Sequence, residues 1–89
     1  RMKKKLESKY VIEKLQELNP EAELISDFDD CLVGYADFRI NGESKFHAVY
    51  DFEYIISELE NKYELIREDA IEYYDFNIAS IQAIVLFKE

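Results

Sequence analysis

The feature that most constrains this fold is an alternating segment that ends in a turn signal. Residues 32–40 alternate between one set of apolar side chains and a more polar set, and Asn41-Gly42 follows directly. Alternation with a period of two predicts a β-strand, and Asn-Gly between two such runs is the strongest short-range signal for a hairpin. We therefore expect two paired strands, over 31–39 and 45–50.

The loop length decides which side chains of this hairpin share a face. A two-residue loop sets Phe38 opposite Lys45, which places an apolar face beside a polar one. A three-residue loop over residues 41–43 sets Phe38 opposite Phe46 instead. Because a slip of one residue moves every side chain to the other face, burial of one face favours the longer loop. We predict a bulged hairpin with Gly42 near the left-handed region.

Other segments also carry periodic or capping signals. We expect regular structure over four of them: a helix over 4–18, a strand over 22–28, a helix over 52–63 and a third helix from about Glu68. Asn19-Pro20 ends the first helix, because the residue before proline avoids the helical region. Asp51 is placed to cap the second helix. The expected buried stripes are Leu6, Tyr10, Leu15 and Leu18, with Val11 at the edge; Phe52, Ile55, Ile56, Leu59 and Tyr63; and Ala70, Ile71, Tyr74, Ile78 and Ile81.

These elements predict one α+β domain over residues 1–89, because 89 residues suffice for one modest core. We expect an N-terminal helix, a three-stranded antiparallel meander and two C-terminal helices packed on one face of the sheet. The segment 83–88 stays open, since its apolar run fits a continued helix or a short edge strand.

Charge is distributed unevenly along the chain. Residues 15–89 hold 18 Asp and Glu against 5 Lys and Arg, a balance of −13, whereas residues 1–14 hold 6 Lys and Arg against 2 Glu, a balance of +4. We expect residues 1–5 to fray as a basic arm, because lysines oppose the helix dipole there, and Met2 to be the natural start after an added Arg1. The acidic body will repel nucleic acid and anionic membranes and favour basic partners, so we expect no direct binding of nucleic acid or membrane.

Residue types that carry catalysis are sparse. The one thiol, Cys31, and the one imidazole, His47, lie roughly 20 Å apart in the predicted register, where His47 faces Asp37 as an exposed pair. Phosphate-binding loops, nucleophile elbows and zinc motifs are absent. We therefore expect no enzyme and no cofactor. A single cysteine and an apolar run too short to span a bilayer favour a cytoplasmic protein.

The densest acidic cluster is the turn Asp27-Phe28-Asp29-Asp30. Its carboxylates could ligate a divalent cation with Asp51, but the spacing excludes an EF-hand loop. Aspartate also favours turns through its own backbone hydrogen bonds. We expect a turn or a partner-binding surface here and assign no metal ligands.

Three motifs carry a resemblance to a known group of proteins. They are Asp29-Asp30-Cys31-Leu32-Val33-Gly34-Tyr35; Tyr50-Asp51-Phe52-Glu53 with Leu59; and Asp69-Ala70-Ile71-Glu72-Tyr73-Tyr74 followed by Phe76-Asn77. Together they resemble small acidic proteins of unknown function from phages, prophages and bacteria. The chain departs from the group's pattern at Arg67 and over residues 81–84. The resemblance implies a viral or mobile-genome context, and a host cytoplasm if the chain is viral, but no functional residues.

These observations converge on a non-enzymatic accessory protein that binds a basic surface of a host protein. Mimicry of DNA by carboxylates, as in anti-CRISPR and other anti-defence inhibitors, is the specific form that we expect. The partner-binding residues predicted are Asp29, Asp30, Glu58, Glu60, Glu64, Glu72, Tyr73 and Asp75. Two alternatives stay open: a metal-binding protein or enzyme that uses Asp27, Asp29, Asp30 and Asp51, and a homo-oligomeric structural domain, for example a homodimer.

Overall fold

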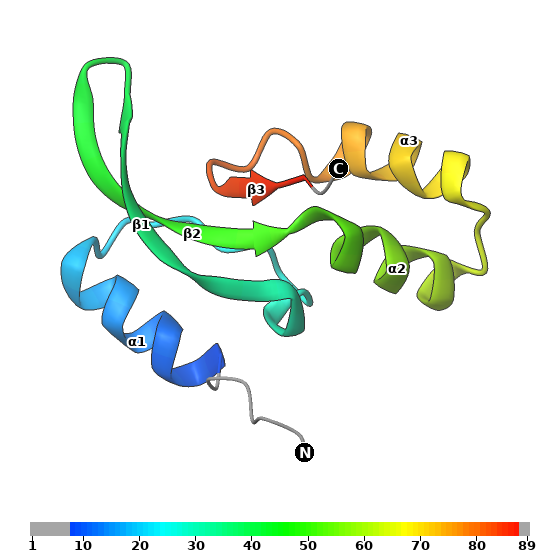
Figure 1. Ribbon diagram of the computed structural model, residues 1–89, viewed down its shortest axis with the longest axis horizontal. Helices are drawn as coiled ribbons and strands as arrows, with labels where there is room; N and C mark the ends of the chain where they lie inside the picture. Colours follow the sequence, from blue (N-terminus) through cyan, green and yellow to red (C-terminus); the bar gives the residue numbers. More distant parts are fainter. Residues whose placement is uncertain (1–7, 88–89) are drawn as a thin grey trace.

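The computed structural model describes residues 8–87 as an α+β fold, which confirms the expected class and the order of an N-terminal helix, strands and two helices (Figure 1). The elements are α1 (Ser8–Leu18), the 3-10 helix η1 (Asp29–Cys31), β1 (Leu32–Ile40), β2 (Glu43–Asp51), α2 (Phe52–Tyr63), α3 (Arg67–Asn77) and β3 (Ile84–Leu86). The expectations for the basic arm, Arg1 and Leu6 lie outside the described residues.

The β1–β2 hairpin has a tight two-residue turn, so the predicted three-residue loop is wrong. Phe38 pairs with Lys45, and Ile40 pairs with Glu43 across the turn. Asn41 and Gly42 have φ angles of 54° and 81°, which confirms that Gly42 is left-handed. Two consecutive residues with positive φ match the twist of the flanking strands, and this local preference prevails over the burial pattern.

A β-bulge at the other end of β1 shifts the pairing with β2 by one residue. The pairing shifts between Leu32, which pairs with Tyr50, and Gly34, which pairs with Val49. A bulge places one extra residue, here Val33, in one strand and changes the side to which the following side chains point. Leu32 therefore points into the core, whereas Ala36 and Phe38 of the same apolar set point to the other face of the sheet.

The third strand is not the one that the sequence predicts. Residues 22–28 form no strand, and β3 instead pairs in parallel with β2, from Val49 with Ile84 to Asp51 with Leu86. The sheet is therefore mixed, in the order β1-β2-β3, and the predicted antiparallel meander is wrong. The open question about residues 83–88 is answered by an edge strand as far as the described residues extend.

Side-chain hydrogen bonds explain why the segment after α1 stays irregular. The Tyr50 hydroxyl accepts a hydrogen bond from the buried Ile25 N–H at 2.9 Å. The Asn19 amide donates to the Phe46 carbonyl at 2.8 Å. These bonds hold the segment against β2 without a ladder, and the ribbon crosses behind the strands in Figure 1.

The core lies between the helices and one face of the sheet. The α2 stripe is buried as expected at Phe52, Ile55, Ile56 and Leu59, but Tyr63 is exposed. In α1 the buried residues are Val11 and Leu15, so the expectation is wrong for Tyr10 and Leu18, which are exposed. The third stripe is buried at Ala70, Tyr74 and Ile78 and half-buried at Ile71 and Ile81, although α3 ends at Asn77.

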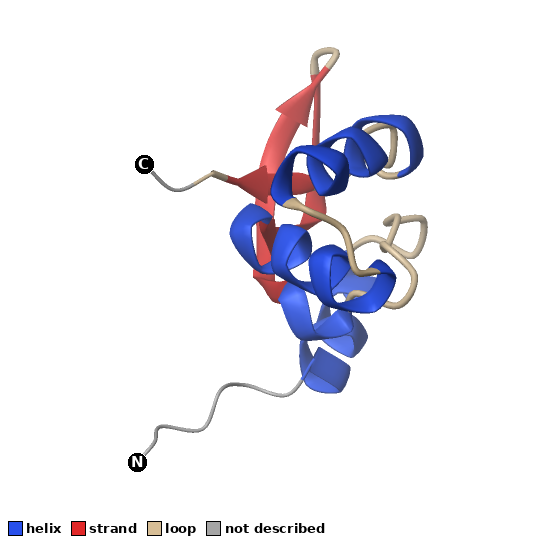
Figure 2. Cartoon of the chain, turned by 90° about the vertical axis from the view of Figure 1, so that its right-hand side faces the viewer, coloured by secondary structure: helices blue, strands red, loops and turns tan. Residues whose placement is uncertain are grey.

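The two faces of the sheet have different surroundings. Ala48 and Tyr50 point into the core, and Figure 2 shows the helices gathered mainly to one side of the strands. The opposite side chains, which we call the outer face, belong to Ala36, Phe38, His47, Val49, Ile84 and Leu86. Phe38 and Leu86 remain half-exposed on this face. Among the helices of the described chain, not one has the length and apolar character needed to cross a membrane.

Candidate protein-binding site

Helix α3 presents a row of carboxylates to solvent. Its buried side is formed by Ala70 and Tyr74, and helical spacing places the acidic residues on the other side. We call this the α3 acidic face, and it consists of Glu68, Asp69, Glu72 and Asp75, all exposed. Glu68 and Asp69 also stabilise the first turn through the helix dipole, whereas Glu72 and Asp75 have no such local role.

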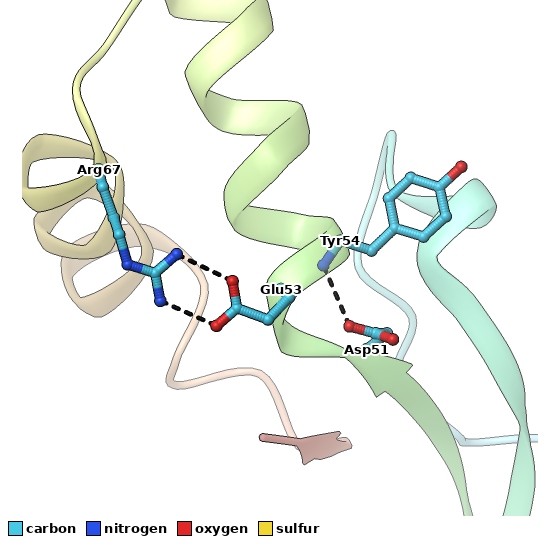
Figure 3. A network of polar contacts seen from close by, with 4 residues as sticks. All are labelled: Asp51, Glu53, Tyr54 and Arg67. Atoms are coloured by element: carbon cyan, nitrogen blue, oxygen red, sulfur yellow. Dashed lines mark hydrogen bonds and ion pairs between the residues drawn. The ribbon is translucent and has the colours of Figure 1, made fainter. Parts of the chain in front are cut away.

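The one cation of α3 is neutralised by the preceding helix. Residues 64–77 hold five Asp and Glu against one Arg, a balance of −4. That residue, Arg67, donates from Nη1 and Nη2 to the two carboxylate oxygens of Glu53, each at 2.8 Å (Figure 3). The hydrogen bond to Glu53, and then the charge of Glu53, raise the pKa of Arg67. The α3 acidic face therefore keeps its full negative charge.

Other predicted site residues belong to α2 and its end. Glu58 and Glu60 are half-buried on α2, and Glu64 is exposed at its C-cap. Glu64 is left-handed, with φ 54°, a conformation that glycine would adopt at less cost. At the other end of the helix, Asp51 caps α2 as predicted by accepting a hydrogen bond from the Tyr54 N–H at 3.1 Å (Figure 3).

Asp29 and Asp30 lie apart from the α3 acidic face. They are exposed on η1, which is found on the opposite side of α2 from α3 in Figure 1. The structure therefore brings together Glu72, Tyr73 and Asp75 on one helix and places Asp29 and Asp30 elsewhere, so the predicted residues do not form a single surface.

Tyr73 forms a pair with Tyr63 instead of standing alone on the surface. The two rings have centroids 5.0 Å apart, and the Tyr73 hydroxyl donates to the Tyr63 hydroxyl at 3.3 Å. This hydrogen bond, with partial desolvation, raises the pKa of Tyr73. Sequence reasoning missed Tyr63 because its position on α2 predicts a buried residue.

A pocket of about 220 Å³ lies beside this tyrosine pair. It is bounded by the irregular residues 24–28, by the end of α2 and by the region from Tyr73 to Ile81. At its rim, the Lys62 ammonium lies 3.9 Å from the Asp27 carboxylate and 5.6 Å from the centroid of the Tyr63 ring. Three segments far apart in the sequence form this pocket, so no local pattern predicts it.

The described residues do not assemble a metal site or a cysteine–histidine pair. Within residues 8–87, no three His, Cys, Asp or Glu side chains lie together as a metal would require. Asp27 pairs with Lys62 and Asp51 caps α2, so these carboxylates have separate structural roles. Cys31 is buried in the core as expected, but His47 is buried opposite Ala36 on the outer face, and not exposed opposite Asp37 as predicted.

Comparisons of this chain with protein-family models, with curated proteins and with solved structures find no match.

Proposed function

We propose that this chain is a non-enzymatic binding protein that docks on a basic surface of another protein. The observation that supports the proposal is the α3 acidic face, whose carboxylates have no cation on their own helix apart from Arg67, which is paired with Glu53. Phe76, 79% exposed among these carboxylates, adds an apolar contact of the kind found at the centre of protein interfaces.

The physical basis is long-range attraction followed by short-range contact. A chain of net charge −9 attracts a cationic surface before contact, which raises the association rate and makes binding sensitive to salt. Exposed carboxylates contribute little individually, so the aromatic residues Tyr73 and Phe76 must supply part of the affinity.

We take the target to be the nucleic-acid channel of a host defence nuclease, as for anti-CRISPR and other DNA-mimic inhibitors. Such channels are lined by the lysines and arginines that phosphate binding requires. The acidity and the resemblance to small phage and prophage proteins both support this form of the proposal. The α3 acidic face would occupy the channel in place of DNA, and the carboxylates of η1 would add to the attraction from a separate surface.

The test is capture of a partner from host lysate by the tagged chain at low and high salt. Glu72→Lys with Asp75→Lys changes the α3 acidic face, and Asp29→Lys with Asp30→Lys changes η1. The matched control, Glu13→Lys with Glu21→Lys, makes the same change in net charge at exposed positions near α1. We expect capture to fall with salt and with the α3 variant, and to persist in the control.

Duplex DNA added to the captured complex should release the partner if the channel is the docking surface. Equal loss of capture in the α3 variant and the control would show that only net charge matters. Capture that is unchanged by salt and by both site variants would rule out the charge-based proposal.

Self-association is a second candidate, favoured by the exposed Phe38 and Leu86 on the outer face. Sedimentation equilibrium decides it: a dimer that Phe38→Glu dissociates supports this candidate, and a monomer at all concentrations rejects it.

A further inference from the structure

The pocket beside Tyr73 has the size of one side chain rather than of a metabolite. Its volume of about 220 Å³ is below the range of about 300–1,000 Å³ that is typical of small-molecule sites. Its lining is mixed and includes three buried apolar residues, Ile25, Phe28 and Ile78. Such a mixed lining suits a long side chain that has both methylene groups and a polar end.

The rim offers the two groups that a cation prefers. Asp27 supplies a carboxylate, and the Tyr63–Tyr73 pair supplies aromatic faces. The chain's own Lys62 already contacts both, at 3.9 Å from Asp27 and 5.6 Å from the centroid of the Tyr63 ring. The rim is therefore arranged for a positive charge, and Lys62 marks where that charge would lie.

Lys62 holds this place only weakly. The side chains of Lys62 and Asp27 are 48% and 75% exposed, and exposed ion pairs contribute little to stability. A guanidinium makes better use of the same groups than an ammonium does, because it binds a carboxylate with two parallel hydrogen bonds and stacks on aromatic rings. An incoming arginine can therefore displace Lys62 from Asp27.

The backbone at Asp27 and the contact between the two tyrosines define the geometry of the rim. Asp27 has a φ of 72°, a strained conformation that aspartate and asparagine tolerate better than most residues. The contact between the Tyr63 and Tyr73 hydroxyls at 3.3 Å fixes the relative position of the two rings. By helical spacing, Asp69 lies one turn before Tyr73 and continues the acidic surface toward the pocket.

We propose that this pocket is the receptor for one arginine side chain of the partner, stacked on the tyrosine pair and paired with Asp27. The inference rests on the proposed function, and it names the partner's chemistry: an exposed arginine at the centre of a basic surface. Arginine is among the residues that most often dominate interface energetics.

A titration followed by NMR tests the pocket without any host protein. The probe is N-acetylarginine amide, and N-acetylcitrulline amide is the control, with nearly the same shape and no charge. We expect the arginine probe to shift the backbone signals around Asp27, Tyr63 and Tyr73 at millimolar concentration, and the citrulline probe to bind at least about fivefold more weakly.

Two variants sharpen the titration. Asp27→Asn removes the charge while keeping a residue that tolerates the left-handed backbone, and it should weaken the arginine probe about two- to fivefold. Lys62→Met removes the competing ammonium while keeping an unbranched chain, and it should strengthen binding by a similar factor. The dispersion of the NMR spectrum verifies that each variant is folded.

The result that overturns the inference is a set of shifts spread over the acidic surface, or equal shifts with citrulline, or no change in either variant. This failure differs from failure of the proposed function. If the α3 variant loses the captured partner while Asp27→Asn binds the arginine probe like the parent, the pocket is not the receptor but the acidic surface still binds. If the probe occupies the pocket but no partner is captured, the proposed function fails alone.

Discussion

The two faces of the sheet show how differently the same three strands can be used. On the core face, Ala48 and Tyr50 are fully buried against the helices. On the outer face, His47 and Val49 are buried, whereas Phe38 and Leu86 are 50% and 52% exposed. The contrast teaches that alternation defines which side chains share a face, whereas the turn and the bulge decide which face meets the helices.

The two faces also differ in whether their buried polar side chains form hydrogen bonds. On the core face the Tyr50 hydroxyl bonds the Ile25 N–H, so a buried polar group is satisfied. On the outer face the buried Nε2 of His47 has no hydrogen-bond partner within the described chain. The core face therefore has defined contacts that mutation should break, and the outer face has fewer.

The largest expected effect is on apolar packing. Leu59→Ala should lower the free energy of unfolding by about 2–5 kcal/mol, because Leu59 is fully buried and truncation leaves a cavity. Leu59 belongs to α2, which covers the core face; truncation of a large apolar residue on the outer face, Phe38→Ala, should cost no more than about 1 kcal/mol. Urea unfolding of both variants measures the difference, and equal losses would show that the outer face is also packed.

The next effect separates the two buried polar side chains. Tyr50→Phe leaves the Ile25 N–H without its acceptor and should cost about 1–3 kcal/mol. His47→Leu removes an unsatisfied ring nitrogen. Its free energy of unfolding should lie within about 1 kcal/mol of the parent's or be higher than the parent's. A large loss in His47→Leu, measured by the same unfolding assay, would indicate that His47 has an unrecognised role.

The glycines of β1 and its turn should respond oppositely. Gly42→Ala should cost about 1 kcal/mol, because Gly42 has a φ of 81° in the turn that sets the register. Gly34→Ala should be neutral or slightly stabilising, because an added Cβ meets no atom of residues 8–87 within 4 Å. Thermal unfolding compares them, and a stabilised Gly42→Ala would contradict the two-residue turn.

The smallest effect at neutral pH concerns Tyr50. Burial raises the pKa of its hydroxyl above the ordinary value of 10.0. Above that value the unfolded chain loses the proton while the folded chain keeps it, so stability falls as the pH rises through this window and is unaffected below it. Unfolding measured between about pH 8 and pH 11 should show this decline, reduced in Tyr50→Phe. An identical decline in that variant would assign it to other groups, among them Tyr74, whose pKa is also raised by burial.

The sequence predicts the features that depend on neighbouring residues. Helical periodicity correctly indicates the buried stripe of α2, and the position of Asp51 before it correctly indicates the cap. The small apolar character of Cys31 correctly indicates burial. Each of these predictions depends only on residues that are close together in the sequence.

Features that depend on distant residues are missed. The expected strand over residues 22–28 fails because the partner of the Ile25 N–H is a hydroxyl 25 positions away. The pocket is missed because Asp27, Lys62 and Tyr73 converge from separate segments. The hairpin register fails for another reason: the preference of Asn41-Gly42 for a tight turn outweighs burial, and the bulge at Val33 compensates.

The parallel strand β3 has a consequence for the order in which the structure assembles and opens. The hairpin closes over two residues, whereas Val49 and Ile84 are 35 positions apart with α2 and α3 between them, so this pairing carries a larger loop-closure cost and we expect it to form later. β3 contributes three residues, none of them fully buried. Its amide protons should therefore exchange with solvent before those of β1 and β2, through openings that release one edge of β2 while the rest of the chain stays folded. In such moments the backbone of Val49–Asp51 is available to another strand, and the kinetics of this opening set how often that happens.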